Sequence, residues 1–168
     1  VTQELFIVAR EQKLGLLHKL LQTYQGPTLV FARTKHGAKK VVRQIRAFGI
    51  SAAEIHSNRS LNQRREALEG FKAGKYQVLV ATDVAARGLD INNISHIYNY
   101  DSPKNALEYT HRIGRTARAG KRGEAITLLS KKDEENFRRV LSDRNIQIQE
   151  EQSPEFERIK FLRYAGGR

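Results

Sequence analysis

Short apolar runs alternate along this chain with longer segments in which apolar residues recur at helical spacing. In the runs 28–32 and 77–81, apolar residues fill both alternating sets of positions, which is typical of strands buried on both faces of a parallel sheet. The helical segments bury one side only, as the leucines at 14, 17, 20 and 21 indicate. We expect strands at 28–32, 51–55, 77–81, 96–100 and 123–129, after an extended opening over 3–8. Helices are expected at 11–24, 35–48, 60–71, from Asn105 onward, and from Ser130 to about 141.

Strands that alternate with helices predict an α/β fold with a mostly parallel sheet and helices on both of its faces. Ligands of such sheets bind beyond the carboxyl ends of the strands. Polar residues follow four of the expected strands at that end, and they should lie along one rim: Arg33-Thr34, His56-Ser57-Asn58, Thr82-Asp83 and Asp101-Ser102. Hydroxyl and guanidinium groups along a rim suit a phosphodiester backbone.

Charge and composition narrow the class of partner. The chain has 168 residues, enough for one domain, and a formal net charge of +12, which favours a polyanion such as nucleic acid. It has no cysteine, so disulfides, thiolate chemistry and cysteine-ligated metals are excluded. We find neither a signal-peptide pattern nor an apolar run of about 18 residues, and we therefore expect a cytoplasmic protein with no membrane partner.

An arginine cluster is the clearest candidate for chemistry. His111, Arg112, Arg115 and Arg118 stand within eight positions, separated by small residues. If the segment is helical, arginines three residues apart fall on one face, where they repel one another unless an anion lies between them. The pattern therefore predicts a polyanion site, with phosphate as the first candidate.

Three segments resemble motifs of the DEAD-box RNA helicases of superfamily 2. LVFARTK at 29–35 is similar to motif IV, ATDVAARGLDI at 81–91 to motif V, and HRIGRTARAG at 111–120 to motif VI. The resemblance covers 1–141 as the C-terminal RecA-like domain, and the region from 56 to 83 is most similar to bacterial helicases of the RhlE type. Residues 142–168 form a C-terminal extension with a basic tail, to which no function is assigned.

The resemblance implies roles for individual residues. Arg115 and Arg118 would contact the γ-phosphate of ATP as arginine fingers, and Asp90 would contact the ribose. His111 and Arg112 would complete the nucleotide site by tying motif VI to its surroundings. The positions implied to face the RNA backbone are Thr34, Arg64, Thr82, Arg87 and Gly88. One departure concerns the QxxR motif, whose glutamine is replaced by Leu61.

The chain lacks a GxxxxGK[ST] phosphate loop and an Asp-Glu-Ala-Asp box. We therefore expect half of an enzyme, in which a separate N-terminal RecA-like domain of the same polypeptide holds most of the ATP and its Mg²⁺. The isolated domain should be inactive as an RNA-stimulated ATPase. Two alternatives stay open, a stand-alone RNA-binding or adaptor module and a DNA helicase domain.

Simpler interpretations apply to several of these residues. Asp83 could cap a helix, Asp90 could pair with Arg87, and His56 could be structural. The basic residues at the start of the second helix, including Lys35, Lys39 and Lys40, are expected to be solvated, with at most a diffuse role toward RNA.

Overall fold

The computed structural model describes residues 1–116 and 122–142. These residues form a six-stranded sheet with the order β1-β6-β5-β2-β4-β3, in which every neighbouring pair is parallel. The strands are β1 (Thr2–Ile7), β2 (Thr28–Phe31), β3 (Ala52–Ile55), β4 (Val78–Ala81), β5 (His96–Asn99) and β6 (Glu124–Leu129). The predicted fold class is confirmed.

Helical segments connect the parallel strands. They are η1 (Arg10–Gln12), α1 (Lys13–Thr23), α2 (Lys35–Ala47), α3 (Leu61–Lys72), α4 (Asp83–Ala86), α5 (Ala106–Ile113) and α6 (Lys131–Ser142). Side chains fix several helix starts, because an oxygen acceptor satisfies a backbone N–H that lacks a helical partner. Thr34 caps α2, Asn105 caps α5 at the expected helix start, and Ser60 with Gln63 forms a capping box at the start of α3.

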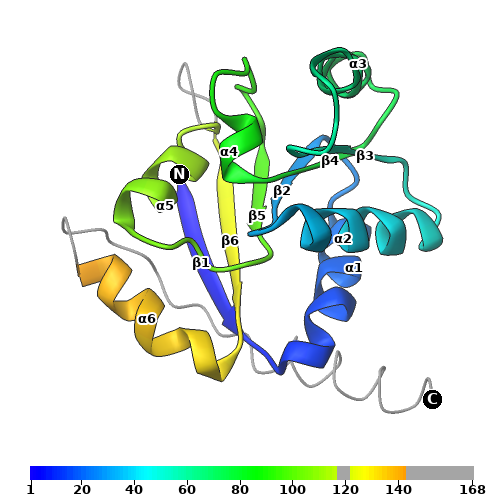
Figure 1. Cartoon of the computed structure of the whole chain (residues 1–168). Helices are drawn as coiled ribbons and strands as arrows, with labels where there is room; N and C mark the ends of the chain where they lie inside the picture. The colour runs from blue at the N-terminus through cyan, green and yellow to red at the C-terminus, as the bar shows by residue number, and fades with distance from the viewer. Residues whose placement is uncertain (117–121, 143–168) are drawn as a thin grey trace.

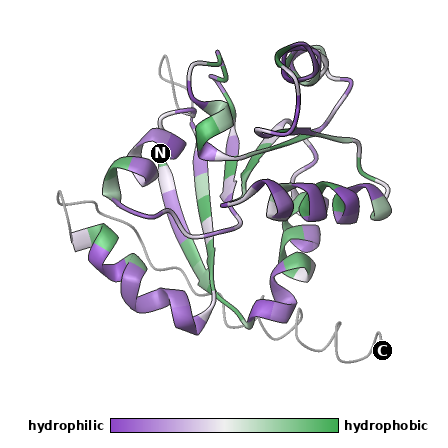
Figure 2. Cartoon of the chain, viewed as in Figure 1, coloured by the Kyte–Doolittle hydropathy of each residue, from purple (hydrophilic) through white to green (hydrophobic). Residues whose placement is uncertain are grey.

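The helices cover the sheet in two layers (Figure 1). On one face α1 and α2 pack over Val30, Val80 and Tyr98. On the other face α3 and α4 pack over the β3–β4 side, while α5 and α6 pack over Leu5 and Leu129. The ribbons of α2 and α6 are mostly hydrophilic in Figure 2, as expected for helices with one buried side.

The structure differs from the expectations in the opening segment and at the end of α5. The opening segment is a full strand, β1, which pairs with β6 over its whole length. α5 ends at Ile113, so Arg115 lies beyond the helix. The basic extension lies outside the described residues, and the proposed boundary at 141 stays a prediction.

Candidate nucleotide and RNA interface

The polar strand ends lie side by side, as predicted. β5, β2, β4 and β3 are consecutive in the sheet, so the residues that follow them form one rim. Backbone N–H groups join these ends: that of Arg33 donates to the Asp101 carboxylate at 2.8 Å, and that of Thr82 donates to the Ile55 carbonyl at 3.2 Å. The rim is therefore a continuous polar edge.

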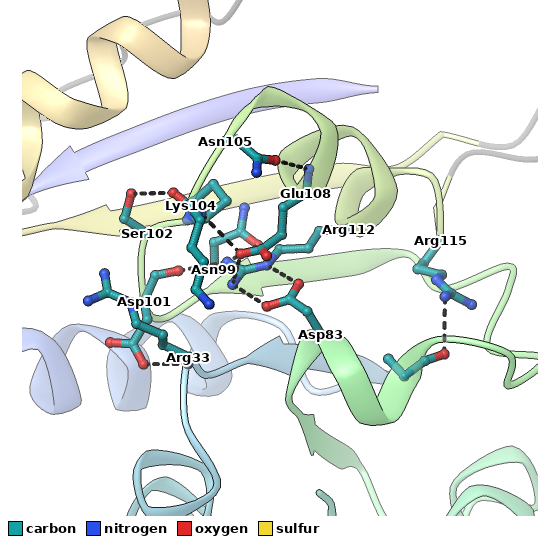
Figure 3. Close-up of polar contacts among 12 residues, drawn as sticks. Arg33, Asp83, Asn99, Asp101, Ser102, Lys104, Asn105, Glu108, Arg112 and Arg115 are labelled. Carbon is teal, nitrogen blue, oxygen red and sulfur yellow. Dashed lines mark hydrogen bonds and ion pairs between the residues drawn. The ribbon is translucent and has the colours of Figure 1, made fainter. Parts of the chain in front are cut away.

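Arg112 is the centre of a buried polar network (Figure 3). Its side chain is 1% exposed, and its Nε and Nη2 donate to the two carboxylate oxygens of Asp83 at 2.7 and 2.8 Å. Nη1 donates to the Asp101 carbonyl at 2.7 Å, and the guanidinium lies over the Phe31 ring. Such bidentate pairing fixes the arginine in position. Arg112 thus joins α5 to α4 and to the end of β5.

This network corrects the expectation for Asp83. Thr82 occupies the N-cap position of α4, and Asp83 is the first residue of the helix. The Asp83 carboxylate binds Arg112 instead of capping backbone N–H groups, because a guanidinium offers it two charge-assisted hydrogen bonds.

Arg115 is half-buried and turns toward the segment after α4. Its Nη1 donates to the Leu89 carbonyl at 2.9 Å, and its Nη2 donates to the Ala86 carbonyl at 3.1 Å. The next residue, Thr116, is buried and donates its hydroxyl to the Ile94 carbonyl. The two segments that resemble motifs V and VI are therefore held together directly.

The expectation of one arginine face is wrong for Arg112 and Arg115. Because α5 ends at Ile113, the two residues do not follow one helical spacing. Arg112 points into the interior toward Asp83, and Arg115 binds backbone carbonyls at residues 86 and 89. These protein acceptors pair with the two guanidinium groups. Arg118 lies outside the described residues.

A cavity of about 760 Å³ lies between α4 and α5. Basic, polar and apolar side chains line this cavity. They include Phe31, Asp83, Arg87, Leu107, His111 and Arg115. His111 is exposed at the end of α5. Exposed Val84 and Leu107 stand on the same two helices. The cavity can receive an anionic or hydrogen-bonding group.

Asp90 lies on the segment after α4, between the cavity-lining residues Arg87 and Asn92. Its side chain is 76% exposed, its carboxylate lies 3.3 Å from Lys72 Nζ, and it accepts a hydrogen bond from Asn92. An exposed carboxylate in this place can accept hydrogen bonds from hydroxyl groups.

The residues expected to face RNA occupy the rim and the loops beside it. Thr34 is exposed and accepts a hydrogen bond from the Gly37 N–H, and Thr82 is buried with no capping hydrogen bond from its side chain. Arg64 is half-buried on the first turn of α3, and Arg87 is exposed just after α4. Gly88 has φ +79°, a conformation that glycine adopts without strain. Leu61, in place of the motif's glutamine, is 48% exposed.

Lys13 is a member of the rim that the sequence analysis missed. It is 5% exposed, donates to the Tyr100 carbonyl at 2.8 Å, and lies 3.9 Å from the Asp101 carboxylate. Burial lowers the pKa of Lys13, while Asp101 opposes the shift. Burial also raises the pKa of Tyr100 to about 12. The sequence could have indicated this buried lysine, because Lys13 precedes Leu16 and Leu17 by three and four residues and so shares the buried side of α1.

The part of the chain that the structure describes has neither a membrane-spanning helix nor a clustered metal-ligand set. No helix there is long and apolar enough to cross a membrane. The same residues contain no group of three histidine, aspartate or glutamate side chains placed to hold a metal ion.

Comparison with known proteins shows the family of this chain. The helicase conserved C-terminal domain family matches residues 12–120. The ATP-dependent RNA helicase DBP2 of Gibberella zeae is 37% identical over 94% of this chain, which spans only 28% of that relative's length.

Solved structures show the same arrangement. The DEAD-box protein SrmB of E. coli, bound to regulator of ribonuclease activity A, is 34% identical with a TM-score of 0.87 over 94% of both chains. A variant of S. cerevisiae Dbp5 bound to RNA and ADP BeF3 is 26% identical with a TM-score of 0.80, over 96% of this chain and 44% of that one. The present chain is therefore a RecA-like helicase C-terminal domain of the DEAD-box RNA helicase family.

Proposed function

We propose that this chain is the second RecA-like half of an ATP-dependent RNA helicase. In this proposal it completes an ATP site with arginine side chains and binds the backbone of single-stranded RNA. The observation that carries the proposal is the contact between Arg115 and the carbonyls of Ala86 and Leu89. It holds the guanidinium against the residue that precedes Asp90, whose carboxylate is exposed.

The Arg115 guanidinium and the Asp90 carboxylate together suit a nucleotide. A guanidinium binds phosphate oxygens, and a carboxylate accepts hydrogen bonds from ribose hydroxyls. ATP supplies the phosphoryl group that is transferred to water, with Mg²⁺ and most phosphate contacts provided by the N-terminal domain. Arg115 would exchange backbone carbonyls for phosphate oxygens, and Arg118 would act beside it. Both would stabilise negative charge that develops during transfer.

His111 and Arg112 take different parts in this proposal. Exposed His111 would face the N-terminal domain across the cavity. Arg112 is buried on Asp83 and would be a positioning residue, which holds α5 in the orientation that presents Arg115. The proposal thus gives Arg112 no direct contact with the nucleotide.

The rim would bind RNA without reading its sequence. Thr34, Thr82 and the backbone N–H of Gly88 would donate hydrogen bonds to phosphate oxygens, while Arg64 and Arg87 add charge. Closure of the two domains around ATP would bend the bound strand and separate it locally from its complement. We place this activity in the cytoplasm, as the sequence led us to expect.

The test is RNA-stimulated ATP hydrolysis by the polypeptide that carries both domains. We expect Arg115→Ala and Arg118→Ala each to lower turnover by about 10³-fold, with RNA affinity nearly unchanged. Arg139→Ala on α6 removes an exposed arginine away from the site and should keep wild-type turnover. Thermal unfolding would check that each variant folds.

Wild-type turnover in both arginine variants would overturn the catalytic assignment. RNA binding with no ATP hydrolysis by the wild type would instead favour an adaptor module. A preference for single-stranded DNA over RNA would favour a DNA helicase.

A further inference from the structure

Helix α2 carries positive charge that its own residues do not balance. Its 13 residues, KHGAKKVVRQIRA, include five lysines and arginines and no acidic residue. The corresponding charges on α6 are interspersed with Asp133, Glu134 and Glu135, and α3 also contains both signs. Charges of one sign at these spacings repel one another and destabilise a helix. Solubility alone therefore does not explain why the charged residues of α2 are all basic.

The charges of α2 face outward. Ala38, Val41, Val42 and Ile45 form its buried side. Four exposed side chains define what we call the α2 basic face: Lys35, Lys39, Lys40 and Arg43. Arg46 is left out because its Nε donates to the Ala52 carbonyl at 3.0 Å.

The α2 basic face begins at the polar rim. Thr34 at the end of β2 is the N-cap of α2, and Lys35 Nζ donates to Asn58 Oδ1 in the loop after β3 at 3.2 Å. Lys39 lies near enough to His56 for its charge to contribute to lowering the pKa of that imidazole. The face is thus continuous with two of the strand ends that form the rim. Figure 1 shows β3 and β4 running between α2 and α3.

The neighbouring carboxylate does not neutralise this surface. Glu54 is 8% exposed, and its Oε1 already lies 3.6 Å from Arg59 and 3.7 Å from His56. Glu54 is thus engaged by Arg59 and His56, and the exposed lysines and arginine of α2 are not its partners in these contacts.

We propose that the α2 basic face is a second RNA contact, which binds phosphates of the strand beyond the part held at the rim. The inference rests on the proposed RNA-binding function and extends its surface along α2. A rise of 1.5 Å per residue separates Lys35 from Arg43 by about 12 Å along the helix. That length matches about three to four phosphates of a stacked strand at about 3.4 Å each. Lysines and an arginine at this spacing bind backbone phosphate without regard to sequence.

The experiment compares two triple variants of the 168-residue protein. One carries Lys39→Gln, Lys40→Gln and Arg43→Gln on α2, and the other carries Lys131→Gln, Lys132→Gln and Arg139→Gln on α6. Each removes three exposed positive charges, so both have the same net charge. Fluorescence anisotropy would measure their affinity for oligouridine RNAs of about 6 and about 15 nucleotides, at several salt concentrations.

We expect the α2 variant to bind the short RNA like the α6 variant and the long RNA about 10-fold more weakly. For the long RNA, the slope of log affinity against log salt should be smaller in magnitude by about 2 than that of the α6 variant. This difference corresponds to three lost phosphate contacts at about 0.7 each. Equal affinities of the two variants for the long RNA would overturn the inference.

A separate variant, Arg87→Ala, distinguishes this outcome from failure of the proposed function. If Arg87→Ala binds the short RNA like the wild type, the rim assignment fails. The α2 inference is still decided by the difference between the two triple variants on the long RNA.

Discussion

Asp83 and Arg112, 29 residues apart in the sequence, form a bidentate ion pair inside the molecule, with Nε–Oδ1 at 2.7 Å and Nη2–Oδ2 at 2.8 Å. The pair connects the first residue of α4 to the last turn of α5. Because the side chains are 1% and 16% exposed, neither charge can be left without the other at low cost.

We predict that Asp83→Asn and Arg112→Met each lower the free energy of unfolding by about 3–5 kcal/mol, because each leaves one buried charge uncompensated. Urea denaturation of the wild type and variants measures this loss. The exposed arginine variant Arg139→Met on α6 is the matched control and should change stability by less than about 0.5 kcal/mol.

The double variant Asp83→Leu/Arg112→Met tests the cause of the loss. It removes both charges, so its cost should be well below the sum of the two single variants. Additive costs, or single variants within about 1 kcal/mol of the wild type, would contradict the assignment of a buried ion pair.

Local sequence signals predicted the elements well. The helix expected at 60–71 begins at a capping box of Ser60 and Gln63. The helix expected at 35–48 is followed by Gly49, which has φ +86°. Polar strand ends also predicted the rim, because parallel strands bring their carboxyl ends to one edge. These features depend on neighbouring residues or on topology alone.

The arrangement of the arginines could not be predicted in the same way. Helical periodicity assumed that α5 continues to Arg115, but the helix ends at Ile113, before Gly114. The partner of Arg112 is a carboxylate on another element, and no spacing rule identifies a contact across 29 residues. The resemblance supplied roles for these residues but not their contacts.

Gly88 offers a test of backbone conformation at the rim. Its φ of +79° lies in the left-handed region, and a Cβ added there would meet no atom within 4 Å. We therefore expect Gly88→Ala to cost about 1–2 kcal/mol of stability through strain alone. Gly88→Asn should cost less, because asparagine tolerates this conformation better. Urea denaturation would compare the two, and an equal or larger loss for asparagine would show that steric contact, not φ, decides.

His56 lies buried at the end of β3, where its Nδ1 accepts a hydrogen bond from the Asn58 N–H at 3.2 Å. Its Nε2 is 3.7 Å from the Glu54 carboxylate. Burial lowers the pKa of His56 below its usual 6.5; Glu54 opposes the shift, and the charges of Arg59 and Lys39 add to it. The folded protein therefore favours the neutral imidazole.

Because the unfolded chain binds this proton more readily, His56 should make the free energy of unfolding fall as pH drops below about 6.5 and approaches the folded pKa. The contribution cannot exceed about 1.4 kcal/mol per pH unit. Urea denaturation at pH 7.5 and 5.5 should show a smaller loss for His56→Gln than for the wild type, while His36→Gln, which changes an exposed histidine, keeps the full loss. An unchanged pH dependence in His56→Gln would mean that other groups carry it.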